Sequence, residues 1–187
     1  LMLCCGFVDA QLSALGNEAV VNTTTANSQQ RPDLAHASSS GNTIVVWESF
    51  AQDGDDFGIY GTVYDSTGAV VLPEFKINTT DSGSQRFPKV ACDSAGNFVV
   101  VWQSEESDRY RIKSQSFLAN GSFNSTVTTV DNSTSGDNKL PAIAMNDAGE
   151  FVITWTSETG DGDEWGVMAS YYGSTVFTIL DNVVVNE

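Results

Sequence analysis

The chain has 187 residues, of which 24 are acidic and 8 are basic, and its formal net charge is −16. Because nucleic-acid binding depends on Lys and Arg at the phosphates, this balance excludes nucleic acid as an expected partner. The chain is rich in Ser, Thr, Asn, Asp, Gly and Val, and no stretch has sustained helical periodicity. These features predict an all-β protein of short strands joined by polar turns.

The N-terminal segment, residues 1–17, begins with the apolar run Leu1–Val8. Eight apolar residues are too few to span a bilayer, so no membrane span is expected. A run that is apolar on both faces predicts a buried strand, and the alternative is the end of a signal peptide cleaved after Ala10. Because the chain does not begin with Met, we expect it to be cut from a longer precursor.

Three cysteines, Cys4, Cys5 and Cys92, leave at least one thiol outside any bridge within the chain. They form no C-x-x-C pair, so the sequence gives no support for a zinc or redox site. A bridge from Cys92 to Cys4 or to Cys5 remains open.

The chain repeats itself with a period of roughly 55 residues. Each copy has a proline, a tryptophan 14 or 15 residues after it, and an Asn or Asp 10 residues before it. The three columns are Pro32, Pro88 and Pro141; Trp47, Trp102 and Trp155; and Asn22, Asn78 and Asp131. The predicted repeats are residues 18–73, 74–126 and 127–182, followed by the first strand of an incomplete fourth repeat at 183–187.

Each repeat is predicted to contain four strands, and the second copy is the type. Phe75–Asn78 and Lys89–Asp93 are half-buried strands, and Tyr110–Phe117 is the last strand. Phe98–Trp102 is a continuous apolar run, typical of a strand buried on both faces. The sequence therefore predicts three tandem antiparallel meanders shaped like propeller blades, with partial repeats at both ends. A β-sandwich is the alternative, because it uses the same alternation.

A Gly-to-Ser strand of the approximate form G-[NF]-x-V-V-x-W-x-S recurs at Gly41–Ser49, Gly96–Ser104 and Gly149–Ser157. Copies one and three add an acidic D-G-D loop, and a G-[IV]-[YF] element follows. This pattern resembles the tandem Trp-containing β-repeats of large secreted and cell-surface proteins. The resemblance covers most of residues 18–187 and implies an extracellular, β-rich repeat protein, and it brings no catalytic residue with it.

The two terminal apolar segments lack partners within the predicted repeats. An exposed edge strand pairs readily with another chain, and a head-to-tail contact that does not close builds a filament. We therefore expect strand exchange between subunits through Leu1, Leu3, Phe7, Val183 and Val185. A fragment of a longer repeat array and a closed sandwich remain as alternatives.

Two further sets of residues are candidate sites. Five N-x-[ST] sequons predict N-glycosylation at Asn22, Asn78, Asn120, Asn124 and Asn132. The acidic loops place candidate Ca²⁺ ligands at Asp53, Asp55, Asp56, Asp161 and Asp163. The alternatives are chance sequons in turn-rich sequence and solvated turns, and no cofactor is required.

A column of aromatic residues follows the acidic loops. It holds Phe57, Tyr110 and Trp165, which either fill the core or stack on sugars if exposed. His36 is the only histidine, and it shares a column with Cys92 and Met145, which favours packing. With one histidine, a Ser–His–Asp mechanism has little room. We therefore expect that the chain is not an enzyme.

Together these features predict a structural subunit of an extracellular, N-glycosylated filament or surface layer that assembles with copies of itself. The alternative is a carbohydrate-binding or adhesin repeat module of a larger secreted protein, with glycans as its partners.

Overall fold

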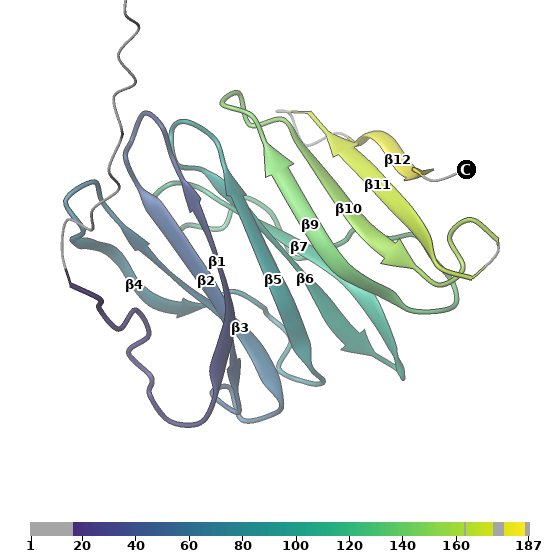
Figure 1. The fold of residues 1–187 in the computed structure, drawn as a ribbon, viewed down its shortest axis with the longest axis horizontal. Helices are drawn as coiled ribbons and strands as arrows, with labels where there is room; N and C mark the ends of the chain where they lie inside the picture. Colours follow the sequence, from purple (N-terminus) through teal and green to yellow (C-terminus); the bar gives the residue numbers. More distant parts are fainter. Residues whose placement is uncertain (1–16, 163, 174–177, 186–187) are drawn as a thin grey trace, which may run out of the picture.

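The computed structural model of the chain describes residues 17–162, 164–173 and 178–185. This part of the protein contains twelve strands and no helix (Figure 1). The prediction of an all-β fold is confirmed. No helix in the described ranges is long and apolar enough to cross a membrane.

The strands form three antiparallel sheets of four strands, each in chain order. The first sheet contains β1 (Gln29–His36), β2 (Thr43–Phe50), β3 (Phe57–Tyr64) and β4 (Val70–Lys76). The second contains β5 (Gln85–Cys92), β6 (Phe98–Glu106), β7 (Arg109–Phe117) and β8 (Thr128–Thr129). The third contains β9 (Asn138–Met145), β10 (Phe151–Ser157), β11 (Gly166–Tyr172) and β12 (Thr178–Val184).

The sheet boundaries differ from the expected repeat boundaries by one strand. Phe75 and Lys76, expected to open the second repeat, belong to β4, the last strand of the first sheet. The Ile77 amide then donates to the Ile59 carbonyl at 2.8 Å and extends this pairing. The apolar residue that precedes the column Asn, here Ile77 before Asn78, therefore pairs with the sheet before it.

The C-terminal strand follows the same rule. Val183 pairs with Ala169 of β11, and the Val185 amide donates to the Val167 carbonyl at 2.8 Å. Val183 and Val185 thus complete the chain's own third sheet, in place of the expected exchange into a neighbouring subunit. Leu1, Leu3, Phe7, Cys4 and Cys5 lie outside the described residues, and the Cys92 thiol is free.

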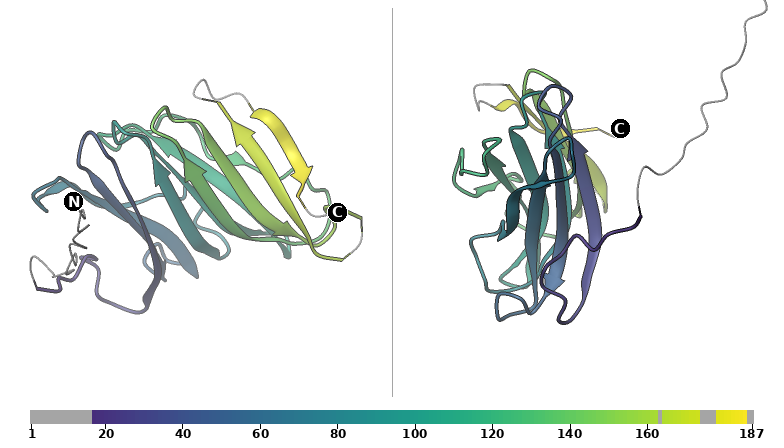
Figure 2. Two further views of the ribbon diagram at one scale, coloured as in Figure 1. Left: turned by 45° about the horizontal axis from the view of Figure 1, so that its top comes forward. Right: turned by 90° about the vertical axis from the view of Figure 1, so that its left-hand side faces the viewer.

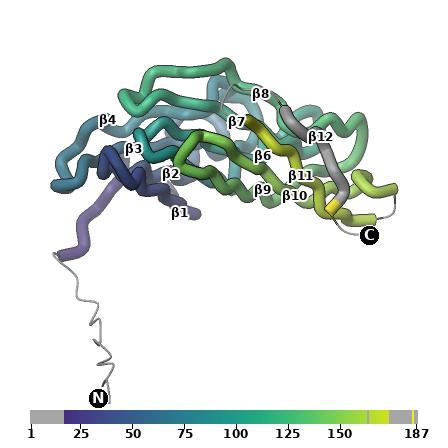
Figure 3. The backbone as a smooth tube through the Cα atoms, turned by 90° about the horizontal axis from the view of Figure 1, so that it is seen from above, coloured from purple at the N-terminus to yellow at the C-terminus, as the bar shows by residue number. Residues whose placement is uncertain are grey.

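The three sheets pack side by side along the chain, as the further views in Figures 2 and 3 show. Their first strands lie next to one another, with β5 between β1 and β9 (Figure 1). We call the edge formed by these three strands the inner edge.

Two apolar cores separate the sheets. The first core contains Ile44, Val46, Ile59, Val63 and Ile77 of the first sheet against Val90, Phe98, Val100, Trp102 and Phe117 of the second. The second core contains Val101, Ile112 and Val130 against Ile153, Trp155 and Met168. Alternate residues of β6 therefore enter different cores, because successive side chains of a strand point to opposite faces. The prediction that Phe98–Trp102 is buried on both faces is confirmed.

Polar side chains fasten the sheets together at the inner edge. The fully buried Glu48 carboxylate accepts hydrogen bonds from Arg31 Nη1 at 2.5 Å, Arg86 Nη2 at 3.0 Å and the Phe87 amide at 3.0 Å. Gln103 Oε1 accepts from the Leu140 amide at 3.3 Å. The two arginines and the amide offset the cost of removing the Glu48 carboxylate from water, and the contacts to Arg86 and Phe87 link the first two sheets.

The amides that these side chains bind lie at irregular positions of β5 and β9. Arg31, Phe87 and Leu140 each precede a proline and have positive φ angles of 51°, 55° and 55°. The pairing register shifts at the same three places. Because proline cannot donate to the ladder, the strand bulges there and frees the preceding amide of the second and third sheets for the previous sheet.

Glu74 on β4 holds the segment that precedes β1. Its carboxylate accepts hydrogen bonds from the Thr23 amide at 2.6 Å, the Thr24 amide at 3.3 Å and Gln52 Nε2 at 2.6 Å. Burial acts to raise the pKa of Glu74, but the hydrogen bonds from Thr24, Thr23 and Gln52 outweigh it and lower the pKa from 4.5 to about 2.

We expect the stability contributed by Glu74 to be lost in acid. Because its pKa is lower in the folded chain, this stability is complete above pH 4.5 and disappears as the pH falls toward 2. Glu74→Gln should therefore lower the urea midpoint more at neutral pH than near the lower end of this window. Glu18→Gln is the control because Glu18 is exposed. An equal loss at both pH values for Glu74→Gln would contradict the assignment.

Candidate functional site

The Asn and Asp column is part of the hydrogen-bond framework that joins consecutive sheets. Asn78 is buried, and its Oδ1 accepts from the Ile59 amide at 2.7 Å. Its Nδ2 donates to the Thr80 carbonyl at 2.7 Å and to Gln85 Oε1 at 3.2 Å. Asn78 thereby ties the end of the first sheet to the start of the second.

Asp131 occupies the same position between the second and third sheets. Its Oδ2 accepts from the Ile112 amide at 2.7 Å, and its Oδ1 accepts from Arg111 Nε at 2.7 Å and Asn138 Nδ2 at 3.2 Å. The Asn78–Gln85 pair and the Asp131–Asn138 pair are therefore two solutions for the same link.

The sequons differ in their surroundings. Asn120, Asn124 and Asn132 are exposed, Asn22 is half-buried, and Asn78 is buried. Because both Nδ2 bonds of Asn78 lie inside the fold, a glycan on that nitrogen would replace one of the two donor hydrogens and would need space that the buried site does not offer. The sequence motif thus identified a repeated structural position, and glycosylation of the exposed asparagines stays a prediction.

A pocket lies beside each of the three column tryptophans. Each pocket is lined by its tryptophan and by the member of the Asn and Asp column in the same repeat. The Gln or Asn that begins the first strand of the sheet completes the set. The volumes beside Trp47, Trp102 and Trp155 are about 340, 210 and 350 Å³.

The pocket beside Trp47 has mainly apolar walls. Its lining contains Val20, Val21, Pro32 and Val45, together with the polar side chains of Asn22, Gln29 and Gln30. Trp47 is buried, and its Nε1 has no acceptor among the described residues. An unsatisfied buried donor costs about 1–3 kcal/mol, which a ligand oxygen would recover.

The neighbouring glutamine does not serve this donor. Gln29 Oε1 accepts from Asn22 Nδ2 at 3.4 Å, and Gln29 Nε2 donates to the Ala26 carbonyl at 2.6 Å. In the third repeat, by contrast, Trp155 Nε1 donates to Asn138 Oδ1 at 3.2 Å. The indole Nε1 of Trp155 therefore has an acceptor within the fold, whereas the Nε1 of Trp47, at the same repeat position, has none among the described residues.

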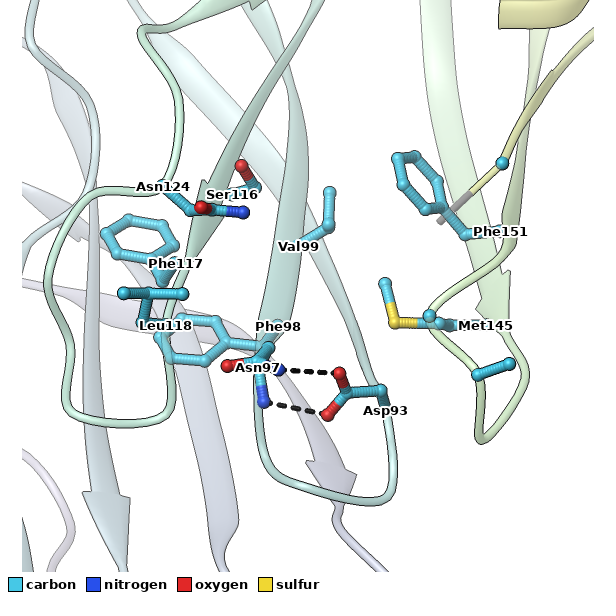
Figure 4. A pocket seen from close by; sticks show the side chains of 13 residues that line it. Asp93, Asn97, Phe98, Val99, Ser116, Phe117, Leu118, Asn124, Met145 and Phe151 are labelled. Carbon is cyan, nitrogen blue, oxygen red and sulfur yellow. Dashed lines mark hydrogen bonds between the residues drawn. The ribbon is translucent and has the colours of Figure 1, made fainter. Parts of the chain in front are cut away.

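A further cavity lies between the second and third sheets near their turns, and Figure 4 shows it from close by. Its volume is about 150 Å³, and Phe98, Met145 and Phe151 line it. The Asp93 carboxylate at its edge accepts from the Gly96 amide at 2.8 Å and from Asn97 Nδ2 at 2.7 Å. Because this polar group is satisfied within its own turn, we interpret the cavity as a packing gap.

The acidic loops do not converge into a metal site in the described part of the chain. No group of three or more His, Cys, Asp or Glu side chains there is arranged to hold a metal ion, and Asp163 lies outside it. Asp55 accepts from the Gly83 amide at 3.1 Å. Both Asp53 carboxylate oxygens are buried, Asp56 is half-buried, and Asp161 is exposed. Burial, together with the charge of Asp53, raises the pKa of Tyr60 to about 12.

Two members of the aromatic column contact basic side chains of the next sheet. The Arg86 guanidinium lies 4.2 Å from the Phe57 ring centroid, and Lys139 Nζ lies 4.9 Å from that of Tyr110. Trp165 is half exposed. Sequence reasoning missed these pairs, although Arg86 and Lys139 both stand two residues before a column proline. His36, expected to pack, is exposed, with Nδ1 3.0 Å from Thr43 Oγ1.

The sequence matches no protein-family model and no curated protein. The fold is similar to solved structures of carbohydrate-active enzymes. An endo-arabinase from Bacteroides thetaiotaomicron has a TM-score of 0.51 at 15% identity, over 83% of this chain and 61% of that one. The catalytic domain of a Coprinopsis cinerea GH62 α-L-arabinofuranosidase has a TM-score of 0.50 at 8% identity, over 89% and 53%.

A third similar structure belongs to the GH130 family of mannoside phosphorylases, which contains glycoside hydrolases that target β-1,2-mannosidic linkages in Candida mannan. Its TM-score is 0.51 at 11% identity, over 86% of this chain and 49% of that one. The chain thus spans about half to three fifths of the length of these enzymes. At such identities the likeness establishes the fold alone.

These comparisons correct two expectations. The predicted filament or surface-layer subunit is contradicted, because the similar solved structures are glycoside hydrolases or phosphorylases. The expectation that the chain is not an enzyme is contradicted by the same finding. The physical reason for the first error is that Val183 and Val185 pair within the third sheet, where the sequence suggested an unpaired edge.

We expect Asn78→Ala to lower the free energy of unfolding by about 1–3 kcal/mol, because it leaves the Ile59 amide buried without its acceptor. Asn78→Asp keeps an acceptor for this amide, but it buries a carboxylate without the arginine that Asp131 has, because Gly58 stands at the position of Arg111; this variant should therefore also be less stable than the parent chain. Urea unfolding measures both. If Asn78→Ala is as stable as the parent chain, the bonds of Asn78 do not contribute to the link between the sheets.

We also expect Asn78 to carry no glycan when the chain is secreted from a glycosylating host. The exposed Asn132 is the internal comparison, since its sequon has the same N-x-[ST] form. Peptide mass spectrometry of the folded protein gives the occupancy of each site. A folded chain with a glycan at Asn78 would show that at least one of the two Nδ2 bonds is dispensable.

Proposed function

We propose that the chain is an extracellular carbohydrate-binding module built from propeller-type β-repeats, and that the pocket beside Trp47 is its primary binding site. The observation that carries this proposal is the pocket of about 340 Å³ lined by Trp47, whose buried Nε1 has no acceptor among the described residues.

The chemistry of this pocket suits a saccharide. A sugar ring presents C–H groups on its faces and hydroxyl oxygens around its rim. Val20, Val21 and Val45 offer apolar contact to the former, while Trp47 Nε1 and the Gln30 side chain offer polar contact to the latter. Pockets of this kind, mostly apolar with a few placed polar groups, are typical of small-molecule sites.

Repetition supports a polymeric ligand. The pockets beside Trp102 and Trp155 occupy equivalent positions and are lined by amide and hydroxyl side chains. Several weak sites on one chain raise the overall affinity for a polymer that spans them. The similarity to enzymes named for arabinose and mannose linkages favours the same class of ligand.

The test is binding of arabinan, arabino-oligosaccharides and β-1,2-linked mannan, measured by calorimetry and by tryptophan fluorescence. Trp47→Phe removes the donor while keeping an aromatic ring, and should weaken binding about five- to tenfold. Trp155→Phe is the comparison variant: its Nε1 already bonds Asn138 and is not free to serve a ligand, so this change should weaken binding less than Trp47→Phe does. Release of reducing ends from the same ligands reports turnover in the same experiment.

Val20→Trp provides a second variant that leaves the core untouched, since Val20 is exposed at the rim of the pocket. It should fill the pocket and reduce binding without lowering the urea midpoint. Equal binding by the wild type, Trp47→Phe and Val20→Trp would place the site elsewhere. Absence of binding by the wild-type chain to all three ligands would overturn the proposal.

A further inference from the structure

Each sheet has one face turned toward the sheet that follows it. In the first sheet this face carries Ile59 and Val63 of β3, and in the second it carries Ile112 of β7. The same repeat positions in the third sheet are Val167 and Tyr171 of β11, which pair with Thr156 and Val152 of β10. We call the surface formed by these four residues and Val185 the open face.

The open face is exposed at positions that are buried elsewhere in the protein. Ile59 and Val63 are 0% and 1% exposed, whereas Val167 and Tyr171 are 38% and 43% exposed. Ile77 and Val130, the last apolar residues of the first two sheets, are 0% and 5% exposed, whereas Val185 is 57% exposed.

Thr156 of the open face and the adjacent Trp165 also stand at repeat positions that contact the following sheet. Thr156 stands where Glu48 and Gln103 accept an amide of the next sheet. Trp165, half exposed, stands where Phe57 and Tyr110 receive a basic side chain from the next sheet. An apolar hollow of about 440 Å³ adjoins Tyr171 and Val152 at the edge of the open face.

We propose that the open face is the docking surface for a further four-stranded sheet of this same repeat type, joined in tandem. The occupant would place an apolar strand ending in Trp-x-Ser against Val152, Val167 and Tyr171, as β6 and β10 do against the sheets before them. It would bring a basic residue onto Trp165 and a bulge amide to Thr156. This proposal does not rest on carbohydrate binding.

The path of the chain favours a tandem repeat over a separate molecule. The hydrogen bond from Val185 to Val167 repeats the bonds from Ile77 to Ile59 and from Val130 to Ile112. In those two cases the next sheet begins at Gln85 and Asn138, only a short loop later. The backbone at Val185 therefore has the same pairing register as the backbone at Ile77 and Val130, from which the chain continues into the following sheet.

The test extends the chain by replacing Glu187 with a copy of residues 79–131, the second sheet and its closing segment. Hydroxyl-radical footprinting then compares side-chain oxidation in the parent and extended chains. Oxidation of Trp165 and Tyr171 should fall several-fold on extension, while oxidation of Phe123, which is exposed on another sheet, should not change. Unfolding should remain a single transition, at a higher urea midpoint than in the parent.

Tyr171→Asp in the extended chain should restore oxidation of Trp165, because it places a charge in the new core. Val71→Asp is the matched control, since Val71 is exposed on β4, away from the open face. Unchanged oxidation of Trp165 and Tyr171 on extension, or an appended segment that is itself oxidised throughout, would overturn the proposal. A parent chain that dimerises in sedimentation and loses the dimer with Tyr171→Asp would assign the face to a second copy and also overturn it.

Discussion

The structure depends on the burial of central strands between two neighbouring sheets. Val100 and Trp102 of β6 enter the core shared with the first sheet, while Val101 enters the core shared with the third. Neither apolar face of a sheet is stable when exposed to water, because burial of apolar surface against a neighbouring sheet supplies the free energy that holds the sheet together. Stacking is therefore the condition for each sheet to form, and the polar links of Glu48 and Gln103 fix how the stack is aligned.

This constraint explains where a binding site can occur. Residues that enter a core are committed to packing, so ligand-binding groups are left to the loops between sheets and to the ends of the strands. Trp47 is buried and lines a pocket with Val20 and Val45, but its Nε1 lacks the acceptor that Asn138 supplies to Trp155. The same repeat position thus has its donor satisfied in the third repeat and unsatisfied in the first, and the proposed function assigns the latter to a ligand.

The similarity to carbohydrate-active enzymes is a similarity of fold, over about half to three fifths of their length. The inner-edge carboxylates in the described residues have structural partners. Glu48 is bound by two arginines and an amide, and Asp33 accepts from the Val90 amide at 2.9 Å. Glu48 and Asp33 thereby link the first sheet to the second.

The sequence by itself determined the all-β class, the period and the burial of Phe98–Trp102, because alternation and turn residues act locally. The sequence also identified Asn78 as a repeated position. It could not show whether this asparagine is an exposed glycan acceptor or a buried residue whose hydrogen bonds join two sheets. Only the tertiary structure decided that Ile77 and Val185 close the sheet before them, that Arg86 covers Phe57, and that Trp47 Nε1 has no acceptor. These outcomes depend on residues far apart in the chain, whose register is set by the packing of whole sheets.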